Sequence, residues 1–244
     1  MTPSTAGALA AALSRSGVDM GALGLAWARA MPAVMIVPAF GLRAIPAPTR
    51  AIMGLALAGT VFPALRPEVV NASEPWALLA LGEAVRGLPL AVAAAVPLWA
   101  ATTAGALADS LRGSPGTTTV PTVEGQTSAL GIPFSLLGCA LFLATGGPAR
   151  IATALALRPV ESHPALGVAT DLVSGITLAL SLGAPLVAAS VVLEAAAALM
   201  ARAASPAHVH ALIAPVRALC SLAVFGLVVD RIATFLAKAV AAVP

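Results

Sequence analysis

Long apolar runs broken by single charged residues are the main pattern along this chain of 244 residues. Three stretches, 87–108, 125–149 and 172–193, contain no Asp, Glu, Lys or Arg. Each reaches or exceeds the roughly 20 residues that a helix needs to cross about 30 Å of hydrocarbon. The pattern therefore provides enough apolar length for at least three membrane spans.

Four shorter apolar stretches are largely bounded by single arginines: 30–42, 51–65, 203–216 and 218–229. Their lengths fit tilted spans, half-spans or helices buried against protein. Near the N-terminus, residues 8–13 are too short for the core of a signal peptide, and no charged region precedes them. We therefore expect an uncleaved first span that begins near Met20.

Alanine and leucine dominate the chain outside two loop-like segments, and no sustained period-two alternation indicates a transmembrane barrel. The first segment, 112–128, gathers Gly, Pro, Thr and Ser, which form turns and compete with helical hydrogen bonding. The second segment, 158–171, holds two prolines, one histidine and three charged residues. The pattern predicts an all-α membrane protein with loops at these two places.

Composition agrees with a membrane protein, because 59% of the residues are apolar and only 9% are charged. The net charge of +3 comes from arginines scattered singly rather than from a basic patch with aromatic residues among them, so nucleic-acid binding is not supported. Arginines lie in nearly every connecting segment, and their distribution does not reveal the membrane orientation.

Prolines and ionisable residues lie at positions that would be unfavourable in a single membrane-spanning helix surrounded by lipid. Seven prolines lie in or beside apolar stretches, where each removes a backbone donor and tends to kink its helix: Pro32, Pro38, Pro89, Pro97, Pro133, Pro148 and Pro185. Arg29, Glu194 and Arg202 lie within or at the edges of apolar helices, and a charge at mid-bilayer costs at least about 2.5 to 3.5 kcal/mol. Neighbouring protein or water satisfies such groups. We therefore expect kinked helices packed in an assembly rather than surrounded by lipid.

Glu83 and Arg86 precede the first long apolar stretch at a spacing of three residues, which places them on one helix face. Gly87 follows and allows close helix approach, and Pro89 suits a first helical turn or a kink. Two interpretations remain open for the charged pair: an ordinary ion pair at a membrane interface, or a specific contact to another subunit.

Catalytic and metal-binding patterns are weak, so the sequence predicts neither an enzyme nor a cofactor. Cys139 and Cys220 lie in apolar stretches without a partner at metal-ligand spacing, and we interpret them as small buried hydrophobic residues. A small-solute transporter is the alternative function, since broken helices coordinate solutes in that class. Asp109 and Glu194 are its only candidate buried carboxylates, and the two halves of the chain do not match.

Several short motifs occur in the same order as in the SctT/FliR family, which this chain resembles. Members of that family are membrane components of the export apparatus in type III secretion systems and flagella. The stretch PAFGLRAIPAPTR at 38–50 follows Arg29 and Pro32, and Gly82 with Glu83 is similar to the family's Gly-Glu pair. Gly105, Asp109 and Gly113 fit its AG-x-x-x-D-x-x-x-G pattern.

Later motifs are closer to the secretion-system branch of the family than to the flagellar branch. They are GQTSALG at 125–131 and LATGGP at 143–148. The helix with Pro, Glu, Arg and Pro at 184–206 resembles a helix of the family as a whole, and Ala-Pro-Val-Arg at 214–217 resembles its Pro-x-Lys motif, with arginine in place of the usual lysine. Arg86 and Pro89 within the Gly-Glu segment, and a short C-terminus, depart from the family pattern.

The resemblance implies a subunit of the type III secretion export gate, in the conduit for unfolded secreted proteins across the bacterial inner membrane. Its implied partners are SctR-like, SctS-like and SctU-like proteins, exported polypeptides and membrane lipid. It also implies a multi-pass protein whose helical hairpins pack in a helical gate that is raised toward the periplasm.

The resemblance divides the chain into an SctR-like region at 1–171 and an SctS-like helical hairpin at 172–244. The sequence permits this division, with long helices at 172–203 and 208–243, a bend at Pro185 and interruptions of the second helix at Arg217 and Arg231.

Two sets of functional residues are expected, the first from the resemblance and the second because unpaired charge among apolar helices is costly. A pore plug is expected in the polar loop, with its residues at Asp109, Arg112, Gly113, Ser114, Pro115, Gly116 and Thr117. Subunit contacts are expected at Glu83 with Arg86 and at Glu194 with Arg202.

Overall fold

The protein is an elongated bundle of helices, which confirms the all-α prediction. The computed structural model describes residues 17, 19–40, 45–69, 75–111, 117–118, 127–157, 164–203 and 210–242. The helices in this part are α2 (Met20–Ile36), α3 (Ala47–Val69), α4 (Trp76–Leu111), α5 (Gly131–Ala144), α6 (Gly147–Leu157), α7 (Pro164–Ala203) and α8 (His210–Ala241). Two short strands, β1 (Thr117–Thr118) and β2 (Thr127–Ser128), pair in antiparallel fashion between α4 and α5.

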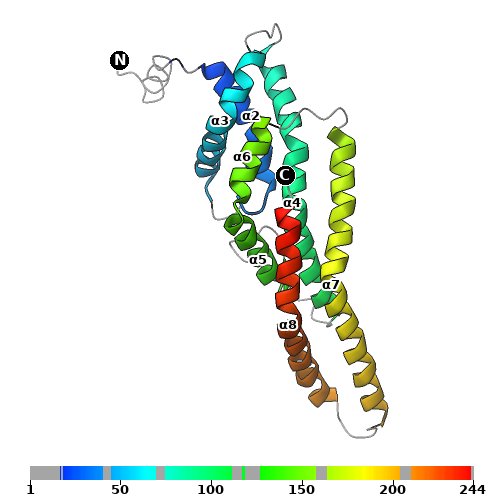
Figure 1. Cartoon of the computed structure of the whole chain (residues 1–244). Coiled ribbons are helices and arrows are strands. Elements are labelled where there is room, and N and C mark those ends of the chain that lie inside the picture. Colours follow the sequence, from blue (N-terminus) through cyan, green and yellow to red (C-terminus); the bar gives the residue numbers. More distant parts are fainter. Residues whose placement is uncertain are drawn as a thin grey trace.

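Helix α4 is the central element of the bundle. Figure 1 shows it running along the molecule with α2 and α3 on one side and α7 on the other. Seven of its buried residues are alanines: Ala91, Ala94, Ala95, Ala100, Ala101, Ala104 and Ala108. Because alanine side chains are small, the neighbouring helices approach α4 closely.

Two glycines of α4 mark its closest contacts. A methyl group at Gly87 would overlap the backbone carbonyl oxygen of Arg29 in α2. A methyl group at Gly105 would lie 2.7 Å from the Cα atom of Gly131, at the start of α5. The expectation that Gly87 allows close helix approach is therefore confirmed.

The structure has fewer long straight helices than the apolar stretches predict. Among the described residues, α4 and α7 are long and apolar enough to cross a membrane, and α5 with α6 would make a third span if this bent pair counts as one. Helix α2 begins at Met20, as expected, but its 17 residues fall short of a full span.

The stretch 125–149 is not one helix, which corrects the sequence prediction. It contains strand β2 and helix α5, and α6 then leaves α5 at an angle of 63°. The cause is the turn at Gly146, whose backbone has a φ of +72°, a left-handed conformation that favours glycine and ends a helix. The next residue, Gly147, lies so close to the Phe142 ring that a methyl group would overlap it.

The predicted long C-terminal hairpin is present as α7 and α8, with two corrections. Helix α7 begins at Pro164, so residues 164–171 of the expected loop are helical. Proline suits the first position of a helix because the backbone N–H at that position has no acceptor within the helix. Helix α8 runs through Arg217 and Arg231 without interruption, because arginine is a good helix former. The proposed boundary at 171/172 thus falls inside α7.

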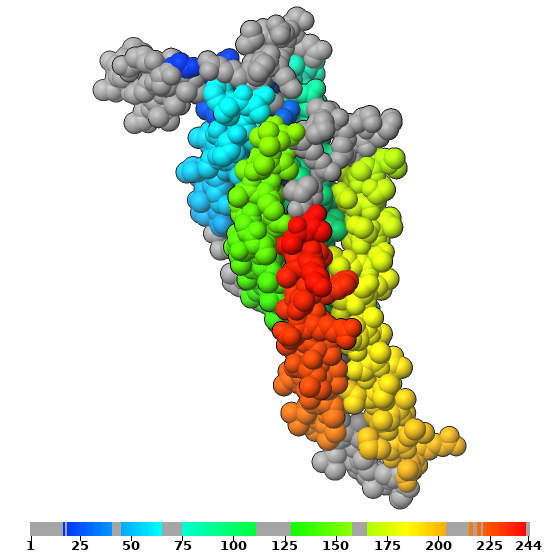
Figure 2. Space-filling model, in the orientation of Figure 1, coloured from blue at the N-terminus to red at the C-terminus, as the bar shows by residue number. Residues whose placement is uncertain are grey.

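The hairpin extends beyond the rest of the molecule. Buried side chains on α7, at Leu182, Leu186 and Ser190, and the close contacts of Gly175 with Val96 place the first part of this helix against α4. Beyond residue 190, α7 and the first part of α8 continue past the end of α4, and Figure 2 shows this projection in yellow and orange.

The contact at Gly87 leads to a stability prediction with a matched control on the same helix. Replacing Gly87 by Ala should destabilise the fold by about 1 to 3 kcal/mol, because the added methyl group forces α2 and α4 apart. Replacing Gly82 by Ala should be neutral or stabilise by up to about 1 kcal/mol, since open space surrounds Gly82 and alanine is the better helix former. Thermal unfolding of the detergent-solubilised protein, followed by circular dichroism, measures both, and equal effects of the two substitutions would contradict the packing argument.

Candidate functional site

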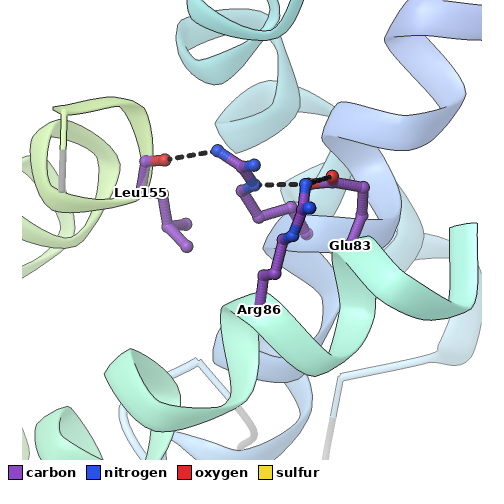
Figure 3. Close-up of polar contacts among 4 residues, drawn as sticks. Glu83, Arg86 and Leu155 are labelled. Carbon is purple, nitrogen blue, oxygen red and sulfur yellow. Dashed lines mark hydrogen bonds and ion pairs between the residues drawn. The ribbon is translucent and has the colours of Figure 1, made fainter. Parts of the chain in front are cut away.

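A buried ion cluster joins α2, α4 and α6. The Arg29 Nε atom lies 2.6 Å from the Glu83 Oε2 atom, and the Arg86 Nη1 atom lies 2.5 Å from the other carboxylate oxygen. Arg29 also donates a hydrogen bond of 3.3 Å from its Nη1 atom to the Leu155 carbonyl oxygen. Figure 3 shows Glu83 and Arg86 on one helix, with the Leu155 carbonyl facing the cluster from another.

The burial of this cluster determines its role. Arg29 and Glu83 are 8% and 7% exposed, whereas the side chain of Arg86 is 44% exposed. Removing one partner of a buried pair leaves a desolvated charge, which is expensive, although the intact pair itself adds little net stability. The Arg29–Glu83 pair therefore specifies how α2 and α4 meet, and the Leu155 contact adds the end of α6 to the same point.

Sequence reasoning found part of this cluster. The expected pairing of Glu83 with Arg86 on one helix face is confirmed. The link from Glu83 to Arg29 was missed, because the two residues are 54 positions apart. One signal pointed toward it, namely that Arg29 in an apolar helix requires a protein or water partner. A contact of Glu83 and Arg86 to another subunit stays a prediction.

Asp109 lies at the base of the polar loop. It is 1% exposed, and its carboxylate accepts a hydrogen bond of 2.5 Å from the backbone N–H of Leu130, just before α5. The Ser128 hydroxyl accepts a second bond, of 3.0 Å, from the Gly131 N–H. The first backbone N–H groups of a helix have no acceptor within that helix. The side chains of Asp109 and Ser128 accept hydrogen bonds from two such groups at the N-terminus of α5.

Both ends of the polar loop are thus held together. Strand β1 pairs with β2, with Thr117 opposite Ser128 and Thr118 opposite Thr127, while Asp109 links the end of α4 to the start of α5. Of the expected plug residues, Asp109 is in this base and Thr117 is in β1. Arg112, Gly113, Ser114, Pro115 and Gly116 lie outside the described residues, and the role of the set stays a prediction.

Glu194 and Arg202 lie on the projecting part of α7, and both are exposed. Eight residues separate them, which corresponds to about 12 Å along the helix. Exposed apolar side chains surround them on the same segment: Val191, Val192, Leu199 and Met200. Exposed apolar side chains gathered on one segment indicate contact with protein or lipid.

The structure offers no metal centre among its described residues, since no group of three His, Cys, Asp or Glu side chains there comes together. Cys139 and Cys220 are both partly buried and are not joined in a disulfide.

The ion cluster yields a double-mutant prediction. Glu83→Leu should cost about 3 to 5 kcal/mol of unfolding free energy, because Arg29 stays buried without this carboxylate. The double variant Arg29→Met with Glu83→Leu should recover most of the loss, since neither charge remains. Arg86→Gln, at the half-exposed position, should cost less than about 1 kcal/mol.

Denaturant titration of the protein in mixed micelles measures these unfolding free energies. A double variant no more stable than Glu83→Leu alone would show that burial of an unpaired charge is not the cause.

Comparison with known proteins identifies the family. Residues 20–243 match the family described as bacterial export proteins, family 1. The chain is also similar to the secretion system apparatus protein SsaT of Salmonella typhimurium (strain LT2), with 42% identity over 73 residues. That match covers 30% of this chain and 28% of the length of SsaT. The family match covers nearly the whole chain and confirms the resemblance to SctT/FliR proteins, so this chain belongs to the bacterial export proteins, family 1.

Proposed function

We propose that this protein is a subunit of a type III secretion export apparatus, in which it forms part of the inner-membrane conduit for unfolded secreted proteins. The observation that carries the proposal is the family match over residues 20–243. The name of the similar SsaT protein, a secretion system apparatus protein, supports the same function. The family match and the name of SsaT both favour protein export over the alternative of small-solute transport. Members of the family are structural components of the export apparatus.

The exposed surface of the chain supports a role inside an assembly. Only 22% of the apolar window of α7 is buried within the chain, compared with 67% for α4. Large apolar side chains remain exposed along both helices of the hairpin, including Val192 and Leu199 on α7 and Leu219 and Leu227 on α8. Such a surface is stable only when protein or lipid covers it. We therefore infer that sibling subunits cover much of the hairpin.

The finer organisation follows the family resemblance. Residues 1–171 act as an SctR-like region and residues 172–244 as an SctS-like hairpin, and the chain assembles with SctR-like, SctS-like and SctU-like proteins. The protein lies in the bacterial inner membrane as a multi-pass subunit, in a gate raised toward the periplasm. The antiparallel course of α7 and α8 supports the hairpin part of this proposal.

The polar loop acts as part of the plug that closes the conduit. Its base is firmly attached, through Asp109 and the β1–β2 pairing, so that α4 and α5 determine where the loop begins and ends. The Gly, Thr and Pro residues of this segment favour turns over a continuous helix. This combination suits an element that seals a pore and yields when a polypeptide passes.

Affinity purification tests membership in the export gate. From a host with a type III secretion system, the tagged protein should co-purify with SctR-like and SctS-like subunits. Glu194→Ala should reduce this recovery, because Glu194 lies on the exposed apolar part of the hairpin where we expect subunit contact. Asp230→Ala is the matched control, since Asp230 is also exposed but lies beside the segment of α8 that packs on the chain itself.

The two outcomes that would contradict these proposals differ. If the unaltered protein captures no export-apparatus subunits, the proposed function is wrong. If the unaltered protein captures them and Glu194→Ala captures as many, only the contact assigned to Glu194 is wrong.

Ion leakage tests the plug. Deleting residues 114–119 should raise the flux of small ions through the assembled gate, because the shortened loop no longer fills the pore. Conductance across membranes that contain the complete gate measures the effect, and co-purification confirms equal assembly. Unchanged leakage in a fully assembled gate would contradict a plug role for the loop.

A further inference from the structure

Arg150 occupies an unusual place at the corner between α5 and α6. It is the fourth residue of α6 and so lies in the first turn of that helix. The N-terminus of a helix carries partial positive charge, so a cation there is unfavourable for its own helix. The position of Arg150 therefore calls for a compensating partner outside α6.

The partner is the C-terminal end of α8, which lies about 90 residues further along the chain. Arg150 donates from its Nη1 atom to the Ala241 carbonyl oxygen at 2.7 Å and from its Nη2 atom to the Val240 carbonyl oxygen at 3.0 Å. Its Nη2 atom also lies 3.2 Å from the Thr145 hydroxyl. The planar guanidinium fork thus spans two successive carbonyl groups and is itself held from the α5–α6 corner.

These two carbonyl groups belong to the last turn of α8, where helical carbonyls have no partner within the helix. The Lys238 carbonyl in the same turn accepts the Ala242 N–H at 3.0 Å. The end of a helix also carries partial negative charge, so the arginine meets both hydrogen-bond acceptors and a favourable dipole.

The buried side chains among the described residues of α8 are apolar. Ile232, Leu236 and Val240 form one buried stripe at a spacing of four residues, and Leu236 approaches Gly138 of α5. Apolar packing is non-directional, and a stripe with a repeat of four residues permits a shift of about 6 Å along the axis. Hydrogen bonds to the final carbonyl groups do not permit that shift, because they recognise the end of the helix.

The corner that carries Arg150 is itself rigidly built. Gly146 provides the left-handed turn, and Gly147 packs on the Phe142 ring, which in turn meets Phe40 edge to face at a centroid distance of 5.9 Å. The Arg150 backbone N–H donates to the Gly146 carbonyl at 3.1 Å. The arginine is therefore presented to α8 from a defined position on the body of the molecule.

We propose that Arg150 is a positioning residue that fixes the axial register of α8, and with it the reach of the projecting α7–α8 hairpin. The importance of that reach for export rests on the proposed function, whereas the register itself does not. A shift of one turn at the docked end would move every exposed side chain of α8 by the same distance. Arg150 thus determines which surface the hairpin offers to neighbouring subunits.

Distance measurements between two spin labels test this inference in the purified full-length chain, without the export gate. In a background with Cys139→Ala and Cys220→Ala, labels are attached through Leu157→Cys on α6 and Leu227→Cys on α8, which are 75% and 83% exposed. With Arg150 present, the distance distribution should be narrow. Arg150→Gln should broaden it or shift it by on the order of 5 Å, the rise of one helical turn.

Two further variants make the result decisive. Arg150→Lys keeps the charge but cannot bridge two carbonyl groups with a planar fork, so its distribution should be broader than that of arginine and narrower than that of glutamine. Arg231→Gln, which removes an exposed arginine from the same helix, should leave the distribution unchanged. The inference is overturned if the distance distribution of Arg150→Lys is as narrow as that of the unaltered protein. This test applies even if Arg150→Gln does not fold. The inference is also overturned if Arg231→Gln broadens the distribution as much as Arg150→Gln does.

Discussion

The pairing of Arg29 with Glu83 is the interaction around which the N-terminal helices are arranged. Both side chains are almost completely buried in a chain that has few charged residues, so neither is tolerated there without the other. Gly87, one turn after Glu83, lets the α4 backbone come up to the Arg29 carbonyl. Leu155 adds the end of α6 to the same point. A polar requirement thus sets the geometry of an otherwise apolar body.

Two helix ends in the described part of the chain are bound by side chains from other helices. Asp109 at the end of α4 binds the backbone just before α5, and Arg150 at the start of α6 binds the last carbonyl groups of α8. Each contact recognises a helix terminus, which apolar packing cannot do. Together they position the polar loop and the C-terminal hairpin on the body, the two parts to which we assign sealing and assembly.

The distribution of exposed apolar surface explains why such anchoring matters. The apolar window of α4 is 67% buried within the chain, whereas the projecting part of the hairpin leaves Leu199, Leu219 and Leu227 exposed. If neighbouring subunits cover this surface, as we propose, it must be presented in one register, because a shift of one turn brings different side chains to the interface. The anchors on the body supply that register before assembly.

Local sequence patterns determined the features that depend on neighbours along the chain. They include the helical class, the start of the first described helix at Met20, the Glu83–Arg86 pair and the long C-terminal hairpin, together with the family resemblance that the family match confirms. Only the tertiary structure decided the Arg29–Glu83 pair and the bond from Asp109 to Leu130. The physical reason is that hydropathy along a chain measures how much apolar surface a segment carries. It does not specify which distant backbone groups and charges that segment must meet.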